Sequence, residues 1–317
     1  MPSGRGLRRV ALARADADVT AAVTARLLEG APIAAEVRAR VAADVVDFTA
    51  SEGHPPGLAV VVCGRDAPSM VYLERILKAC ASVGIAGELV DVPGDTPGDQ
   101  ERELTAAIRR LNGDPLIAGI IVQMPLPPGV RLKTLVDVID PVKDIDGIHP
   151  LNAGLLRLGY EGFVPATAHA AMEMLGHSGV TIEGADAVVI GRSPVVGMPV
   201  AFMLTKADAT VTVCHTKTRN LADKTRRADI VVVAAGHPGL VTGDMLKPGS
   251  IVIDVGINVV DGHIVGDVDL ASAREVAAAI TPVPGGIGPL TNALLLAHLM
   301  RAAQRQKSDQ SPIGSDG

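Results

Sequence analysis

Residues 187–204 read A-V-V-I-G-R-S-P-V-V-G-M-P-V-A-F-M-L, and this stretch decides the fold. The first four residues are an apolar run typical of a buried strand. Gly191 follows at once and permits a tight turn, and from Gly197 on the apolar residues continue as a helix. A helix N-terminus at this place presents unpaired N–H groups and a positive dipole, so the stretch predicts a pyrophosphate site.

The glycine pattern of this turn is incomplete. The dinucleotide fingerprint has glycine where Ser193 and Val196 stand, so the motif also fits an ordinary turn between a strand and a helix. The next strand ends where enzymes specific for NAD usually carry an acid for the ribose, but residues 215–219 read H-T-K-T-R. Arg192 and Thr216 offer donors for a 2′-phosphate, which favours NADP over NAD, whereas the cations within 217–219 also fit a solvated loop.

Outward from this stretch, apolar strands alternate with helical patterns in both halves of the chain. Such strands indicate parallel sheets covered on both faces. We therefore expect the α/β class, with two α/β domains, a cleft between them and a Rossmann-like NADP-binding second domain. The expected strands are 57–63, 87–92, 117–123, 185–190, 210–214, 230–234 and 251–255, and the expected helices of the first half are 33–48, 69–83 and 99–111.

Domain boundaries follow from this rhythm. The first domain is expected over residues 25–165, joined by a returning helix at 290–306, and the NADP-binding domain over residues 166–289. Residues 1–24 and 307–317 are expected to be flexible tails, because they carry too little patterned apolar surface to fold.

Composition excludes several classes of protein. The chain has 317 residues, a net charge of −6 and no tryptophan, so it offers neither a basic footprint nor stacking platforms for nucleic acid. No apolar run reaches membrane-spanning length. The three cysteines lack C-x-x-C spacing and the eight histidines are dispersed, so we expect no metal site, no disulfide and a cytoplasmic location.

Residues 281–291 read T-P-V-P-G-G-I-G-P-L-T. Three prolines fix φ and three glycines free it, so the run can be neither a regular helix nor a central strand. It carries no charge, and any recognition there would use backbone N–H and C=O groups. A rigid turn that ends a strand and begins a helix is the alternative.

Several strings then stand in the order found in one family. They are S-M-V-Y-L-E-R-I-L-K-A-C at 69–80, V-Q-M-P-L-P at 122–127, K-D-I-D-G at 143–147, D-V-G-I-N at 254–258 and the loop just described. The chain resembles the bifunctional methylenetetrahydrofolate dehydrogenase/cyclohydrolase family over residues 27–301. The resemblance implies hydride transfer from 5,10-methylenetetrahydrofolate to NADP, then opening of the methenyl cation by water to 10-formyltetrahydrofolate. It also implies a homodimer built through the cofactor domain.

The resemblance also implies roles for single residues. Asp146 matches the carboxylate that holds the pterin, Gln123 the glutamine beside the catalytic group, and Tyr72 the tyrosine that stacks on the folate. A carboxylate can accept two parallel N–H bonds from the pterin edge, although a D-x-D-G turn is the alternative for Asp146. Further substrate contacts are expected from Pro284, Gly285 and Gly286, and cofactor contacts from Gly191, Arg192, Ser193, Val196, Gly197, His215, Thr216 and Ile257.

One departure from the family concerns the chemistry. The family places its catalytic lysine four residues after the tyrosine, and here that position is Ile76. Isoleucine can neither donate nor accept a proton. Lys78 should point away from the cleft, whereas Arg75 lies closer and can supply positive charge but is a poor proton shuttle.

Loss of this lysine should damage hydrolysis more than hydride transfer, which chiefly needs two rings held in contact. We therefore expect an NADP-dependent dehydrogenase with weak or absent cyclohydrolase activity. One alternative is a fully bifunctional enzyme in which Arg75 or a water chain replaces the lysine. Two others are a folate- and NADP-binding protein with little catalysis and an NADP dehydrogenase for another substrate.

Overall fold

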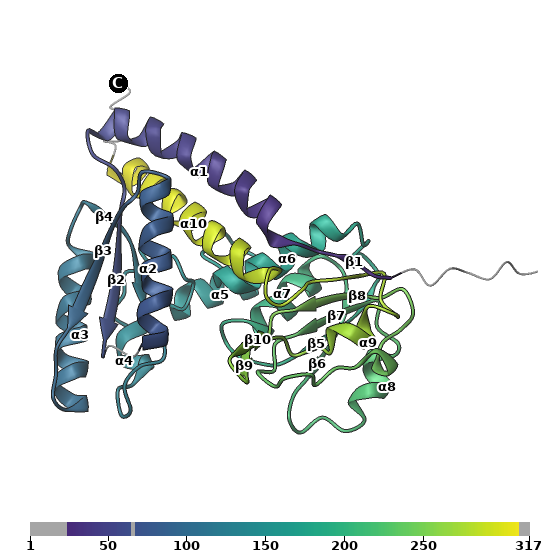
Figure 1. Cartoon of the computed structure of the whole chain (residues 1–317). Helices are drawn as coiled ribbons and strands as arrows, with labels where there is room; N and C mark the ends of the chain where they lie inside the picture. Colours follow the sequence, from purple (N-terminus) through teal and green to yellow (C-terminus); the bar gives the residue numbers. More distant parts are fainter. Residues whose placement is uncertain (1–23, 65–66, 311–317) are drawn as a thin grey trace, which may run out of the picture.

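The computed structural model describes residues 24–64 and 67–310, and the side chains of residues 67–72, 309 and 310 are outside that description. Two α/β lobes lie side by side, and two long helices, α1 (Gly30–Glu52) and α10 (Ile287–Gln310), run next to each other across them (Figure 1). The expected fold class is confirmed. Of the expected tails, residues 1–23 and 311–317 lie outside the described residues.

The first lobe contains a three-stranded parallel sheet with the order β3-β2-β4. Every residue of β2 and β4 is buried, which explains their continuous apolar sequences. At the start of α3 the Thr96 side chain accepts the N–H of Asp99 at 3.2 Å, a normal N-cap. The elements are β2 (Gly57–Cys63), α2 (Ala67–Ser82), β3 (Ala86–Val92), α3 (Pro97–Asn112), β4 (Ile117–Val122), α4 (Leu132–Val136) and α5 (Pro150–Leu158).

The second lobe contains a six-stranded parallel sheet with the order β1-β11-β8-β7-β5-β6. From β5 the chain proceeds to β6 on one side and to β7 and β8 on the other, so the strand order reverses at β5. Ligands of open α/β sheets bind at the carboxyl ends of strands beside such a reversal. The elements are α6 (Ala166–Ser178), β5 (Asp186–Ile190), α7 (Gly197–Lys206), β6 (Thr210–Cys214), α8 (Leu221–Thr225), β7 (Ile230–Val233), η1 (Gly243–Met245), β8 (Ile251–Asp254) and α9 (Leu270–Ala273).

Four short strands differ from the expectation. β1 (Arg26–Leu27) pairs with β11 (Ala279–Ile280) at the edge of the second sheet, and β9 (Asn258–Val260) forms an antiparallel hairpin with β10 (His263–Val265). The expected assignment of residues 25–27 to the first domain is therefore wrong, because β1 takes its backbone hydrogen bonds from the other lobe.

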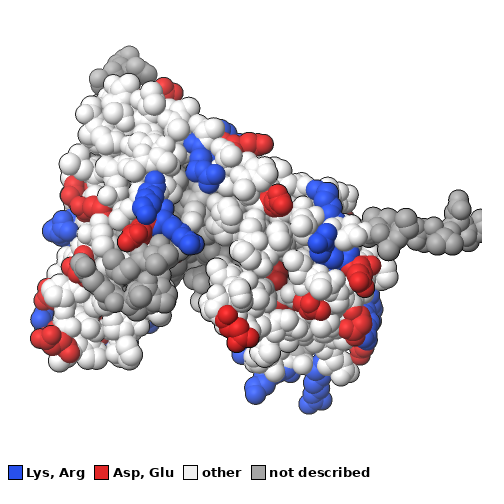
Figure 2. Space-filling view, in the orientation of Figure 1, with Lys and Arg blue, Asp and Glu red and all other residues white. Residues whose placement is uncertain are grey.

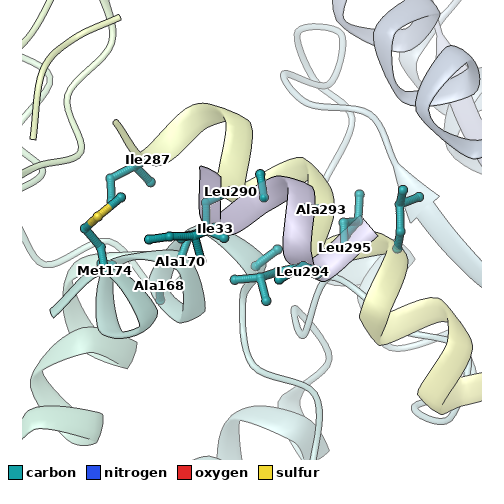
Figure 3. Packing of buried hydrophobic residues seen from close by; sticks show 14 of the residues in the cluster. Ile33, Ala168, Ala170, Met174, Ile287, Leu290, Ala293, Leu294 and Leu295 are labelled. Carbon is teal, nitrogen blue, oxygen red and sulfur yellow. The ribbon is translucent and has the colours of Figure 1, made fainter. Parts of the chain in front are cut away.

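Helix α10 joins the cores of both lobes. It packs against α1, α6 and β4, and small side chains of α6 let the helices approach closely. The helix extends to Gln310, where the ammonium of Lys307 lies 2.6 Å from a carboxylate oxygen of Glu52 on α1. The expected tail is thus wrong for residues 307–310. Figure 3 shows Ile33 of α1, Ala168, Ala170 and Met174 of α6, and Ile287, Leu290, Ala293, Leu294 and Leu295 of α10 in this core.

Two further observations bear on function. No described helix has both the length and the apolar character needed to cross a bilayer. Nor do the described residues include a group of three or more histidine, cysteine or acidic side chains placed to hold a metal ion.

Candidate active site

The surface is hollowed between the two lobes, as Figure 2 shows. Two cavities of about 490 and about 170 Å³ there share two lining residues, Thr167 and Thr291. The larger is lined by the carboxyl end of β8, Arg75 of α2 and residues 282–289, which comprise the loop before α10 and the first three residues of that helix and are called the loop 282–289 below. The smaller is lined by the carboxyl end of β4 and the start of α6. Because residues from both halves line each cavity, the two form one site.

Asp144 organises the turn that carries Asp146. Its carboxylate is fully buried and accepts the N–H groups of Ile148 at 3.1 Å and His149 at 2.8 Å. It also accepts the side-chain N–H of Asn152 at 2.8 Å. The turn is therefore rigid before any ligand arrives.

Asp146 lines the smaller cavity and is half-buried. Burial, together with the neighbouring Asp144 carboxylate, raises the pKa of Asp146 to about 7. A carboxylate poised near neutrality in a cleft is a candidate for ligand recognition or proton transfer.

Gln123 follows β4 directly and lines the same cavity as Asp146. Its backbone N–H donates to the carbonyl of Val61 at 2.9 Å, and its side-chain amide donates to the carbonyl of Met124 at 2.5 Å. The structure thus brings Gln123 and Asp146 together. The side chain of Tyr72, the third residue of this expected group, lies outside the described part of the chain.

Ile76 lies in the hydrophobic core and lines neither cavity. It is 2 % exposed and shares a face of α2 with Leu73 and Cys80, which are fully buried. An isoleucine at this position is therefore explained by packing. The Ile76 side chain therefore makes no direct contribution to proton transfer in the cleft.

The two cations beside Ile76 differ in placement. Arg75 is exposed and lines the larger cavity, opposite the loop 282–289. The side chain of Lys78 is 79 % exposed, lies 3.6 Å from the Glu74 carboxylate and lines neither cavity. Arg75 is thus the cation that α2 offers to the site.

The loop over residues 282–289 forms one wall of the larger cavity and includes Pro284, Gly285 and Gly286. Gly285 has φ of +113°, a backbone conformation that only glycine adopts easily. The N–H of Gly30 donates to the carbonyl of Gly285 at 2.9 Å and holds the loop against the start of α1. The structure makes this run a shaped wall of the cleft.

Two buried carboxylates support the other wall. Asp254, at the end of β8, accepts the N–H groups of Gly256 and Val268, each at 2.9 Å. Burial raises the pKa of Asp254 to about 6, with the neighbouring Asp267 as a smaller cause. Asp267 accepts three successive N–H groups of residues 235–237 and the side-chain N–H of Asn258. Between them these acids fix the loops at the carboxyl ends of β7 and β8.

The expected pyrophosphate turn lies at the same edge of the second sheet. Gly191 has φ of +121°, and its N–H donates to the carbonyl of Cys214 at 2.9 Å. A side chain at Gly191 would overlap the carbonyl of Ala234, and one at Gly197 would overlap the carbonyl of Gly191. Both glycines are thus required by close backbone contacts. The hydroxyl of Ser193 accepts the N–H of Val196 at 3.0 Å, and α7 has no side-chain cap.

The turn after β6 lies next to the first turn, because β5 and β6 pair in register. The N–H of His215 donates to the Thr218 hydroxyl at 2.8 Å, and Nδ1 of His215 accepts the N–H of Lys217 at 3.1 Å. Arg192 and Thr216 are both exposed beside this turn. These residues lie outside the linings of the two cavities, whereas Ile257 lines the larger cavity and is 67 % exposed.

Several further residues of the cleft have no recognisable signal in the sequence. Thr167 and Thr291 line both cavities, and Thr291 is the last residue of the run 281–291. Asn292 lines the larger cavity, and its buried Oδ1 has no hydrogen-bond partner among the described residues. Only the three-dimensional arrangement reveals these positions, because they carry no motif of their own.

Comparisons with known proteins agree with this arrangement. Two models of the tetrahydrofolate dehydrogenase/cyclohydrolase family match the chain, the catalytic domain over residues 28–146 and the NAD(P)-binding domain over residues 165–307. The chain is 48% identical over 295 residues to the bifunctional protein FolD of Bordetella petrii, which covers 93% of this chain and 99% of that protein. With the FolD protein of Heliobacterium modesticaldum, it is 48% identical over 279 residues, covering 88% and 96%.

Solved structures lead to the same family. The FolD enzyme of Campylobacter jejuni superposes with a TM-score of 0.84 and 41% identity, covering 88% of this chain and 98% of that chain. The methylenetetrahydrofolate dehydrogenase-cyclohydrolase of Trypanosoma brucei, complexed with NADP and an inhibitor, gives 0.84 and 38%, covering 91% and 99%. Fold and cleft define a two-lobed α/β protein with a dinucleotide-binding lobe. The chain belongs to the tetrahydrofolate dehydrogenase/cyclohydrolase family.

Proposed function

We propose that this protein is an NADP-dependent 5,10-methylenetetrahydrofolate dehydrogenase. The observation that carries the proposal is the cleft that joins Asp146, Gln123 and the loop 282–289, in a chain 48% identical to a FolD protein over 93% of its length. The nicotinamide lies in the larger cavity and the folate reaches into the smaller one. Hydride transfer then requires only that the walls hold the two rings in contact and exclude water.

In this proposal Asp146 accepts two N–H bonds from the pterin, with Gln123 beside it and the ring of Tyr72 stacked on the folate. The rigidity of the turn that Asp144 anchors supports the role of Asp146, because the carboxylate needs no reorganisation on binding. Pro284, Gly285 and Gly286 contact substrate from the opposite wall.

NADP is the proposed cofactor. The pyrophosphate would lie over residues 191–197, where Gly191 and Gly197 permit the close backbone contacts that shape the turn and the start of α7 has no side-chain cap. Arg192, His215 and Thr216 surround the 2′-phosphate, and Ile257 contacts the nicotinamide. A relative that is 38% identical was solved with NADP, which supports this assignment.

Two candidate functions differ in the hydrolytic step, and one observation supports each. Relatives that share 48% identity and nearly full length are named bifunctional, and their names favour a fully bifunctional enzyme over the loss expected from the sequence. Arg75, which lines the larger cavity, would then supply the positive charge. The second candidate is a dehydrogenase with slow hydrolysis, and it rests on the burial of Ile76 at 2 % exposure.

We further propose the division into a folate-binding domain of residues 28–165 with α10, and an NADP-binding domain of residues 166–289 with β1. The packing of α10 against α1 and β4 supports the first part of this division. We also propose a homodimer. The exposed apolar side chains of the β9–β10 hairpin, among them Val259 at 73%, support this assembly through the cofactor domain.

One assay tests these proposals together. The purified protein is mixed with methylenetetrahydrofolate and NADP, and NADPH, methenyl and 10-formyl products are followed in time. We expect NADPH to form. If neither NADP nor, in a parallel assay, NAD is reduced, the dehydrogenase proposal is wrong. Rapid 10-formyl product supports the bifunctional candidate, whereas accumulation of the methenyl cation supports slow hydrolysis. Light scattering of the same sample gives the mass of the assembly.

A further inference from the structure

Two histidines, His298 buried and His169 half-buried, lie close in sequence to residues that line the smaller cavity. His298 of α10 is 3 % exposed, and its Nε2 lies 2.9 Å from Nδ1 of His169 of α6. The ring planes differ by 10°, and the ring centroids are 5.2 Å apart. With the nitrogens 2.9 Å apart, this geometry is that of two rings joined edge to edge by a hydrogen bond, and not of stacked faces.

The carbonyl of Ile145, which contacts His298, determines which nitrogens of the two rings carry protons. Nδ1 of His298 lies 2.9 Å from the carbonyl oxygen of Ile145, and a carbonyl can only accept, so that nitrogen carries the proton. In the neutral ring Nε2 is then an acceptor, and Nδ1 of His169 donates to it. Burial lowers the pKa of both rings, that of His298 to about 3, so the chain of donors stays intact at neutral pH.

This chain of hydrogen bonds connects three walls of the smaller cavity. His169 lies two residues after Thr167, His298 lies one turn after Leu295, and Ile145 directly precedes Asp146. Thr167, Leu295 and Asp146 all line that cavity. The hydrogen bonds thus run from the start of α6, through α10, to the turn that carries the acid.

The Ile145 carbonyl belongs to the peptide plane that sets the direction of Asp146. Ile145 is fully buried, and the imidazole of His298 is the partner that the structure gives to this carbonyl. The other end of the turn is held by Asp144, through its bonds to Ile148 and His149. Removing His298 would leave a buried acceptor unsatisfied and free the peptide plane to rotate.

We propose that His298, oriented by His169, is a positioning residue that fixes Asp146 for the pterin end of the folate. The inference rests on the proposed function, since it takes the smaller cavity as the folate subsite. Neither histidine touches the reacting atoms, so the pair sets the affinity for folate and leaves the hydride-transfer step and NADP binding unchanged.

The test compares His298→Leu, which removes the donor, with His298→Asn, whose amide can still donate to the Ile145 carbonyl. Kinetics are measured with the full chain and both substrates, and urea unfolding reports stability. We expect His298→Leu to raise the KM for methylenetetrahydrofolate by about two- to tenfold, the loss of one hydrogen bond, with kcat and the KM for NADP unchanged. His298→Asn should restore most of the affinity.

An unchanged folate KM in a folded His298→Leu protein overturns the inference. A parallel fall in kcat and in affinity for both substrates also overturns it, because that is the signature of a merely structural role. If His298→Leu does not fold, His169→Leu is used instead, since His169 is less buried and its loss only frees the His298 ring. Failure of the wild-type protein to reduce NADP would count against the proposed function itself, which separates the two outcomes.

Discussion

Gly30 and Gly286 touch each other backbone to backbone, so closely that a side chain on Gly30 would overlap the carbonyl oxygen of Gly286. Gly30 begins α1, and Gly286 lies in the loop 282–289 that walls the cleft. The contact therefore sets the distance between the loop and α1. This distance is possible only because Gly30 has no Cβ atom.

Gly30→Ala should move the loop and lower stability by about 1–3 kcal/mol, the usual cost of overpacking a close contact. Urea unfolding measures the loss, and the KM for folate should rise in the same variant. Gly176→Ala is the matched control, because Gly176 lies in α6 with nothing near its added Cβ. A Gly30→Ala protein as stable as the control would contradict this reading of the contact.

The pH dependence of folate use should report Asp146. Its pKa is raised to about 7, and only the ionised form accepts two N–H bonds from a pterin. We therefore expect kcat/KM for methylenetetrahydrofolate to rise with pH up to about 7 and then to level off. Asp146→Asn should abolish this rise. If kcat/KM of the variant still rises with pH, a group other than Asp146 causes the pH dependence.

The raised pKa of Asp146 also affects stability, which should fall as pH rises, whereas kcat/KM should rise. Between pH 3.8, the ordinary pKa of an aspartate, and about 7, the folded protein holds a proton on Asp146 that the unfolded chain has lost. Stability contributed by this group is present at low pH and falls as pH rises through that window. Unfolding in urea at several pH values should show a smaller fall for Asp146→Asn than for the wild type.

Ile76→Lys tests the hydrolytic step. If slow hydrolysis reflects the missing lysine, the variant should raise methenyl hydrolysis more than dehydrogenation. It should also be less stable, because the substitution brings an ammonium group to a core position where the isoleucine is only 2 % exposed. Ile76→Met is the control, since it is unbranched and neutral. Equal effects of Ile76→Lys on both activities would contradict the proposal that a lysine at this position serves hydrolysis more than dehydrogenation.

Arg192→Ala tests cofactor choice. Loss of one charged hydrogen bond to a 2′-phosphate should raise the KM for NADP by about ten- to a hundredfold, with little change in the KM for NAD. Arg219→Ala is the matched control, because Arg219 is also exposed near the same turn but is expected to remain solvated. Similar losses for both cofactors would show that Arg192 does not read the 2′-phosphate.

The sequence predicted the fold where apolar runs are long. Strand β6 has the expected bounds, and β2 likewise, because each is a run of five to seven apolar or β-branched residues. The two-residue strands β1 and β11 were missed. A pair of residues has no periodicity, and β1 and its partner β11 stand about 250 positions apart in the chain.

The candidate site was predictable in part for the same reason. Gln123, Asp146 and the proline-glycine loop stand in recognisable strings, and the structure brings them to one cleft. Thr167 and His298 could not be found this way. Each acquires its place from packing between α6 and α10, which local spacing does not encode.

The pairing of α1 with α10 has a consequence for synthesis on the ribosome. Helix α1 is among the first elements to emerge, but the helix that covers its apolar face ends at Gln310. Until translation is nearly complete, α1 and the face of β4 beneath α10 remain uncovered, and the nascent chain presents apolar surface that chaperones recognise. Contacts so distant in sequence also make closure of the first lobe a late event in folding.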